Sequence, residues 1–178
     1  RAITSLAGDD VGFNDRRWQS EHSLDNIQYV YGVALMKCAM ALQYFLPGIP
    51  CIYYGDEAGQ QGYKDPFNRR TYPWEKQDAN LIEYAAELGK IRRMSRVFEK
   101  GTVEFVEVTS KHCIFKRIDK EKGLGALIAL NRSSEAVSLS LSELIGARAD
   151  VKVARRSNES DKIYVSPFDY EVVFYSLS

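Results

Sequence analysis

The sequence is poor in the residues that build several common kinds of functional site. Its 178 residues include only two histidines and three cysteines, and 24 basic residues balance 24 acidic ones. The cysteines, Cys38, Cys51 and Cys113, are widely spaced in apolar contexts, which suits reduced structural thiols better than a disulfide framework. Because the charge is balanced, nothing in the composition favours binding to nucleic acid or to an anionic membrane surface.

Long apolar runs and nucleotide-binding motifs are also missing. No run reaches the roughly 20 apolar residues of a membrane-spanning helix, and no signal peptide, glycine-rich nucleotide loop or G-x-S-x-G sequence is present. His112 and Cys113 are neighbours and would face opposite ways on a strand, so they do not form a metal site. We expect no cofactor, metal, nucleic-acid or membrane partner for this segment, and a cytoplasmic location.

The N-terminal residues have the pattern of an α/β protein. Residues 1–22 are polar and aperiodic, which predicts a loop in which Asp9 and Asp10 are solvated. Ser23 can cap a helix, since apolar residues that include Ile27 and Val30 recur after it at helical spacing, which predicts that these side chains are buried. Pro47 and Gly48 end it, and the first residue is arginine, so we expect further sequence before it.

A short apolar run and a long loop come next. Residues 49–54 are apolar without polar alternation, which predicts a strand buried on both faces, as in a parallel sheet. Residues 55–79 then form a connection of about 25 residues, a length that usually indicates a functional loop. Asn80 and Glu83 have the spacing of a capping box and predict the start of a second helix.

The texture changes near residues 98–101. Short alternating runs separated by turn residues then follow, and their regular spacing predicts an antiparallel sandwich or barrel. These runs are TVEFVEV, HCIFKRI, ALIAL, VSLSL, VKVARR, KIYVS and EVVFYSL. The division therefore predicts two domains, residues 1–98 and residues 99–178.

The first domain is incomplete on this interpretation. A strand buried on both faces needs parallel neighbours, because otherwise its backbone donors and acceptors stay unpaired. Residues 1–98 offer no other strong candidate strand. We therefore expect the chain, taken alone, to expose apolar surface and to self-associate.

The run PGIPCIYYGDEAGQQGYKDPFNRRTYPW, residues 47–74, carries a family resemblance. Its PG-x-P-x-IYYGDE, DP-x-x-R and PW elements resemble the segment around the eighth barrel strand of the alpha-amylase superfamily, glycoside hydrolase family 13. The similarity is greatest to its cyclomaltodextrinases, neopullulanases and alpha-glucosidases. The resemblance implies that residues 1–98 are the C-terminal part of a (β/α)8 TIM barrel, as helix, strand, long loop and helix, and that residues 99–178 are an all-β antiparallel sandwich.

The resemblance also implies an activity. Members of the family hydrolyse or transfer α-glucosidic bonds with retention, through an Asp nucleophile, a Glu acid/base and a second Asp on the fourth, fifth and seventh barrel strands. All three would precede Arg1, so we expect no catalytic residue in this chain and no hydrolysis by it alone. The implied substrates are α-1,4-linked maltooligosaccharides or α-glucans. A calcium site in the preceding part stays open, and a non-catalytic carbohydrate-binding or scaffolding module is the alternative.

The long loop carries the candidate binding residues. In a (β/α)8 barrel the loop after a strand lies on the active-site face, so residues 55–79 should border the sugar. Tyr63 offers a flat apolar face to a pyranose, while Asp65 and Arg69 offer charge-assisted hydrogen bonds and best match the family's sugar contacts. An ion pair between Asp65 and Arg69 that holds the loop is an equally weighted interpretation. Asp56 and Glu57 are adjacent and would point to opposite sides at the end of a strand, so the two cannot easily flank one bond. This favours a structural role for Asp56 over catalysis.

Overall fold

The structure is a computed structural model that describes residues 1–9, 15–146, 150–154 and 161–177, with the backbone alone for 152–154. Asp10 and the last two residues of the predicted VKVARR strand lie outside these residues. The chain divides into two compact units, which are described separately. Unit 1 contains residues 1–40 and 51–88, and unit 2 contains residues 41–50 and 89–178.

Unit 1 begins with two short helices where a loop was predicted. They are α1 (Ala2–Leu6) and α2 (Arg16–Glu21), so the prediction for residues 1–22 was wrong. Asp15 caps α2, because its Oδ1 accepts a hydrogen bond from the backbone N–H of Trp18 at 3.0 Å. A six-residue helix with polar ends has too little apolar periodicity to be recognised from sequence.

Helix α3 (Asn26–Phe45) begins later than predicted, and its first turns do not bury the predicted side chains. Its first turn is closed by Asp25 and Gln28, each side chain accepting from the other's backbone N–H at 2.8 and 3.0 Å, so Ser23 is not the cap. The predicted buried stripe was wrong at Ile27 and Val30, which are 82% and 68% exposed. None of the described residues of this unit covers these two side chains.

Residues 49–54 do not form a strand. Ile49 is 94% exposed, and Tyr53 and Tyr54 are also exposed. All sheets in the described part of the chain are antiparallel and lie between residues 102 and 176, so these residues have no parallel neighbour to pair with. The prediction of a buried strand was therefore wrong, and the described ranges of the chain contain no barrel sheet.

The long loop contains two single-turn 3-10 helices, η1 (Asp56–Ala58) and η2 (Phe67–Arg69). Helix α4 (Ala79–Arg93) follows, and its cap is Asp78 and not Asn80. One carboxylate oxygen of Asp78 accepts from the backbone N–H of Leu81 at 3.1 Å, and the other accepts from the hydroxyl of Tyr29 at 3.1 Å. The cap thus also ties the end of the loop to α3.

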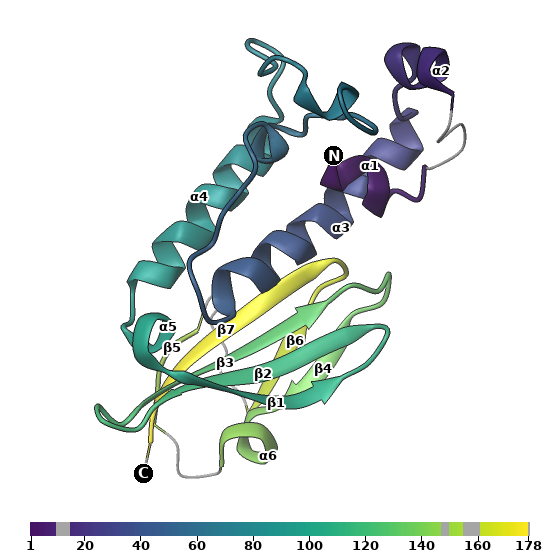
Figure 1. The fold of residues 1–178 in the computed structure, drawn as a ribbon. Coiled ribbons are helices and arrows are strands. Elements are labelled where there is room, and N and C mark those ends of the chain that lie inside the picture. The colour runs from purple at the N-terminus through teal and green to yellow at the C-terminus, as the bar shows by residue number, and fades with distance from the viewer. Residues whose placement is uncertain (10–14, 147–149, 155–160, 178) are drawn as a thin grey trace. The chain divides into compact units, whose positions relative to one another are not determined.

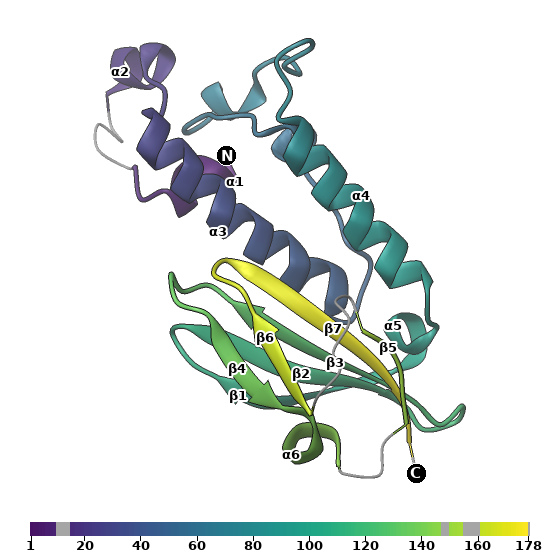
Figure 2. The ribbon, with the colours of Figure 1, turned by 180° about the vertical axis from the view of Figure 1, so that it is seen from behind.

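Unit 2 contains two antiparallel sheets, which confirms the antiparallel pattern predicted for the C-terminal part (Figures 1 and 2). The larger sheet has the order β1-β2-β3-β7-β5, formed by β1 (Thr102–Val108), β2 (His112–Asp119), β3 (Leu124–Asn131), β7 (Asp169–Ser176) and β5 (Asp150–Ala154). The smaller sheet pairs β4 (Val137–Ser140) with β6 (Lys162–Val165). Two short helices complete the unit, α5 (Val97–Lys100) and α6 (Leu141–Ile145).

The two sheets of unit 2 share one apolar core. Alternate side chains of β2, β3 and β7 face those of β6 and α6, as the period of two in a strand requires. The buried members are Ile114, Leu127, Ala129, Leu141, Ile163, Val165, Val173 and Tyr175. The alternating runs of the sequence therefore correspond to a two-layer packing.

Two arginines hold the remaining parts of unit 2 together. The buried guanidinium of Arg117 donates to the carbonyl oxygens of Phe45, Phe98 and Gly101 at 2.8, 3.1 and 2.7 Å. Arg92 donates to the carbonyl oxygens of Tyr44 and Gly48. The bonds to Tyr44, Phe45 and Gly48 satisfy carbonyls at and beyond the C-terminus of α3, which have no partner within the helix.

No helix in the described ranges has both the length and the apolar character needed to cross a membrane.

Candidate functional site

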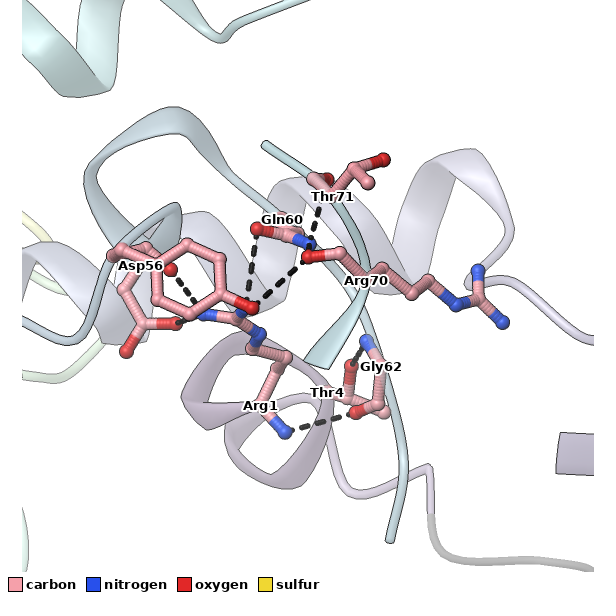
Figure 3. Close-up of polar contacts among 8 residues, drawn as sticks. Arg1, Thr4, Asp56, Gln60, Gly62, Arg70 and Thr71 are labelled. Atoms are coloured by element: carbon pink, nitrogen blue, oxygen red, sulfur yellow. Dashed lines mark hydrogen bonds and ion pairs between the residues drawn. The ribbon is translucent and has the colours of Figure 1, made fainter. Parts of the chain in front are cut away.

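The long loop of unit 1 is anchored by the side chain of Arg1 (Figure 3). The guanidinium is buried and donates to Asp56 Oδ1 at 3.2 Å, to Gln60 Oε1 at 3.1 Å and to the carbonyl oxygen of Tyr54. The guanidinium carbon of Arg1, Cζ, also lies 4.4 Å from the ring centroid of Tyr53. A buried guanidinium needs this many acceptors, since burying a charge without partners is costly.

A second set of bonds closes the loop on itself. The amide of Gln60 donates to the carbonyl oxygens of Arg70 and Thr71 at 2.8 and 3.1 Å (Figure 3). Farther along, the backbone N–H of Gly62 donates to the hydroxyl of Thr4 on α1 at 3.2 Å. The loop is therefore fixed at both Gln60 and Gly62, although it contains little regular secondary structure.

Burial governs the electrostatics of Asp56. It raises the pKa of this carboxyl above its ordinary value, while the hydrogen bond and charge of Arg1 act in the opposite direction. Asp56 thus has the structural, paired environment that was predicted for it. The neighbouring Glu57 lies close enough to Tyr72 to raise the pKa of that phenol, together with desolvation, the larger cause.

Tyr63 lies in a cluster that sequence reasoning did not assemble. Its hydroxyl donates to Asp9 Oδ2 at 2.6 Å, and His22 Nε2 lies 3.0 Å from the same oxygen. Burial and the hydrogen bond to Asp9 raise the pKa of Tyr63. The ring of Trp18 stacks on His22 with centroids 4.0 Å apart and meets Tyr63 edge-on at 4.9 Å.

Asp65 and Arg69 form the ion pair that was one of the two interpretations. Arg69 Nε lies 2.6 Å from Asp65 Oδ1, and the side chains of Arg69 and Asp65 remain 68% and 60% exposed. An exposed pair of this kind adds little to stability, about 0 to 1 kcal/mol. Most of its hydrogen-bonding capacity faces water. The contact of Asp65 and Arg69 with sugar stays a prediction.

The prediction that Asp9 is solvated was wrong, because its side chain is 5% exposed and bonded to Tyr63. Trp18 and His22 were not identified as site residues. Their spacing of four places them on one side of a helical turn, but that signal is usable only once the segment is known to be helical. Their meeting with Tyr63, more than forty residues later, is a tertiary contact.

The described residues include no group of three or more His, Cys, Asp or Glu side chains that could hold a metal ion. What unit 1 presents is a fixed loop with partly exposed aromatic rings and one exposed ion pair. Such groups can bind and orient a polyhydroxylated ligand, since rings pack on C–H faces and charges bond to hydroxyls.

Some known proteins are similar to this chain in sequence, and others are similar to it in fold. The chain is 33% identical over 137 residues to a cyclomaltodextrinase from Thermoanaerobacter pseudethanolicus, covering 76% of this chain and 24% of that protein. It is 31% identical over 154 residues to a cyclomaltodextrinase from Geobacillus thermopakistaniensis, covering 82% and 26%. The chain thus spans about a quarter of the length of these relatives. No family model matches it.

Among solved structures, the fold is similar to an Anoxybacillus alpha-amylase, with a TM-score of 0.69 and 24% identity over 83% of this chain and 33% of that one. A maltogenic amylase from S. marinus gives a TM-score of 0.61 at 27% identity, over 82% of this chain and 20% of that one. These two relatives in sequence are named cyclomaltodextrinases, and these two relatives in fold are named amylases.

Proposed function

Because this chain is homologous to proteins of the alpha-amylase superfamily, glycoside hydrolase family 13, we propose that it is a portion of a retaining α-glycoside hydrolase. The substrates proposed are α-1,4-linked maltooligosaccharides or related α-glucans. The names of the relatives, cyclomaltodextrinase and alpha-amylase, support this class of substrate. The cytoplasmic location stays a prediction.

In this proposal residues 1–98 are the last part of the catalytic (β/α)8 barrel and residues 99–178 are its C-terminal sandwich. Two features of the structure support it. The order helix, extended segment, loop and helix over residues 26–93 fits one end of a barrel. The exposed apolar side chains of Ile27, Val30 and Ile49 are those that barrel neighbours would cover.

The observation that carries the proposed role is the exposed Asp65–Arg69 pair on a loop anchored by a buried arginine. Arg1 and Gln60 fix the loop, so the pair is presented without a large ordering cost on binding. Asp65 and Arg69 would bond to sugar hydroxyls, and the ring of Tyr63 would face the pyranose. These residues bind and orient the substrate.

Bond cleavage belongs to carboxyl groups outside this chain. Retention requires two carboxyl groups about 5 Å apart, one ionised as the nucleophile and one protonated as the acid. Asp56 does not fill either role in this proposal, since it is paired with Arg1. The Asp, Glu and Asp of the family would precede Arg1.

The test compares the full-length protein with the 178-residue chain on maltotriose and p-nitrophenyl α-glucoside. We expect hydrolysis by the full-length protein and none by the chain alone. In the full-length protein, Asp65→Asn and Arg69→Met should each lower kcat/KM for maltotriose by about tenfold to a hundredfold, as for loss of a charge-assisted hydrogen bond.

The matched control is Lys111→Met, which removes another exposed ion pair, to Glu135 at 3.6 Å in unit 2. It should leave kcat/KM unchanged. A full-length protein that binds glucan without cleaving it would instead support the alternative of a carbohydrate-binding module. Unchanged kinetics in both loop variants would remove Asp65 and Arg69 from the binding site.

A further inference from the structure

Helix α2 and the long loop form one continuous piece of unit 1. Arg70 of the loop donates through Nη2 to the carbonyl oxygens of Gln19 and Ser20 at 3.3 and 3.0 Å. In the other direction, Arg16 of α2 donates to the carbonyl oxygen of Asp65. Since these bonds run both ways, side chains of α2 belong to the same surface as the candidate sugar-binding loop.

The aromatic rings of this surface are held in one arrangement. Trp18 and His22 stack with an interplanar angle of 21°, and Trp18 meets Tyr63 at 64°. All three side chains are partly exposed, so the cluster is not part of a sealed core. An edge-on or stacked geometry is the favourable one for aromatic pairs.

The polar edges of the cluster are fixed by one buried carboxylate. Asp9 Oδ2 accepts from the hydroxyl of Tyr63 and lies within hydrogen-bond distance of His22 Nε2. The phenol therefore already has a partner, and what Tyr63 and Trp18 have left to offer a ligand is apolar ring surface. Because the rings are held before binding, little side-chain entropy is lost when a ligand packs on them.

From this arrangement we propose that Trp18 is a stacking residue for a glucosyl unit of the α-glucan. Asp9 and His22 are positioning residues that hold the rings of Tyr63 and Trp18. This inference rests on the proposed function and extends its binding site from the loop to α2. The exposed charges of Asp65 and Arg69, on the stretch of loop to which Arg16 is bonded, supply partners for hydroxyls of the same chain of sugars.

The experiment uses the full-length protein with maltoheptaose as the probe. Calorimetric titration should give a dissociation constant about five- to tenfold higher for Trp18→Ala, as expected for loss of one aromatic contact, and a smaller increase for Trp18→Phe. The control is Tyr164→Ala, which removes an aromatic side chain 60% exposed on β6. It should leave the dissociation constant unchanged.

Positioning is tested separately at Asp9. Asp9→Asn keeps an acceptor for the hydroxyl of Tyr63, whereas Asp9→Ala removes it, so only Asp9→Ala should raise KM while kcat stays the same. Equal effects of the two variants on KM would overturn this role. Thermal unfolding of each variant, measured beside the kinetics, identifies changes that come from loss of folding.

A spectroscopic measurement tests the role of Trp18 without removing its indole ring. In protein labelled with 5-fluorotryptophan, the Trp18 resonance, assigned from its disappearance in Trp18→Phe, should shift on addition of maltoheptaose. No shift, together with normal wild-type binding and an unchanged dissociation constant in Trp18→Ala, would overturn this inference and leave the proposed function standing. Wild-type protein that neither binds nor cleaves maltooligosaccharides would overturn both.

Discussion

At the scale of single residues, the loop of unit 1 depends on one buried pair of opposite charges. Arg1 satisfies Asp56, Gln60 and the Tyr54 carbonyl at once. Removing one member of a buried pair costs about 3 to 5 kcal/mol, because the other charge remains buried. The sequence favoured a structural role for Asp56, but Arg1 as its partner, more than fifty residues away, was not predictable.

The pH dependence of stability tests the environment of Asp56. Its pKa is raised above 3.8, chiefly by burial. A carboxyl with a higher pKa in the folded state binds its proton more tightly when folded, so its contribution is full below 3.8 and is lost as pH rises through the folded pKa. We expect the free energy of unfolding of the wild type, relative to Asp56→Asn, to fall as pH rises above 3.8.

Urea unfolding at a series of pH values measures this difference. Glu83→Gln, an exposed change on α4, is the control for the loss of one acidic group. A difference that grows with pH would contradict the prediction and would show that pairing with Arg1 outweighs burial.

At the scale of elements, the sequence pattern predicted whether a segment is a helix or a strand better than it predicted what packs against that segment. Helices α3 and α4 and the antiparallel strands follow from periodicity, because burial on one side leaves a regular trace. Helix α2 leaves no such trace, since it is held by bonds from Arg70 and not by an apolar stripe. The apolar run 49–54 indicates burial between strands, and the described residues contain no strand to pair with it.

The sequence likewise predicted only part of the candidate site. The ion pair between Asp65 and Arg69 could be anticipated from their spacing of four. The cluster of Trp18, His22 and Tyr63 could not, because it joins segments whose distance in sequence carries no periodic signal.

The packing of α1 on α3 gives a prediction at this scale. A Cβ added at Gly32 would lie 2.9 Å from the carbonyl oxygen and 3.0 Å from Cγ1 of Ile3. Gly32→Ala should therefore destabilise unit 1 by about 1 to 3 kcal/mol, although alanine favours helix.

Gly89 in α4 is the matched control, since its nearest neighbours, on Arg93 and Tyr44, would lie 3.5 and 3.8 Å from an added Cβ. Gly89→Ala should stabilise by about 0.5 to 1 kcal/mol. Chemical unfolding followed by circular dichroism compares the two variants. Stabilisation by both would show that α1 moves away from α3 without cost.

At the scale of the whole molecule, apolar exposure is the main feature. Ile27 and Val30 of unit 1, and Ile49 of unit 2, are large aliphatic side chains that are mostly exposed. Surfaces of this kind mark contacts with another protein segment or a second copy. Which of these covers them in the full-length protein depends on the proposed barrel.

The 178-residue chain expressed alone should self-associate through the exposed side chains of Ile27 and Val30. We expect sedimentation velocity to show species larger than 20.2 kDa that become fewer in the double variant Ile27→Lys and Val30→Glu. Ala39→Lys with Asn80→Glu, at two exposed positions, is the control and should not change the distribution. A monomeric wild-type chain would contradict this prediction.

Arg70 joins its neighbours through two chemically different parts. Its carbonyl oxygen accepts from Gln60, and its guanidinium donates to two carbonyls of α2. Any residue supplies the carbonyl, but only a long cationic side chain supplies the second attachment. Substitutions at this one codon would therefore remove the bonds to Gln19 and Ser20 while leaving the bond from Gln60 in place, so the two attachments can be separated genetically.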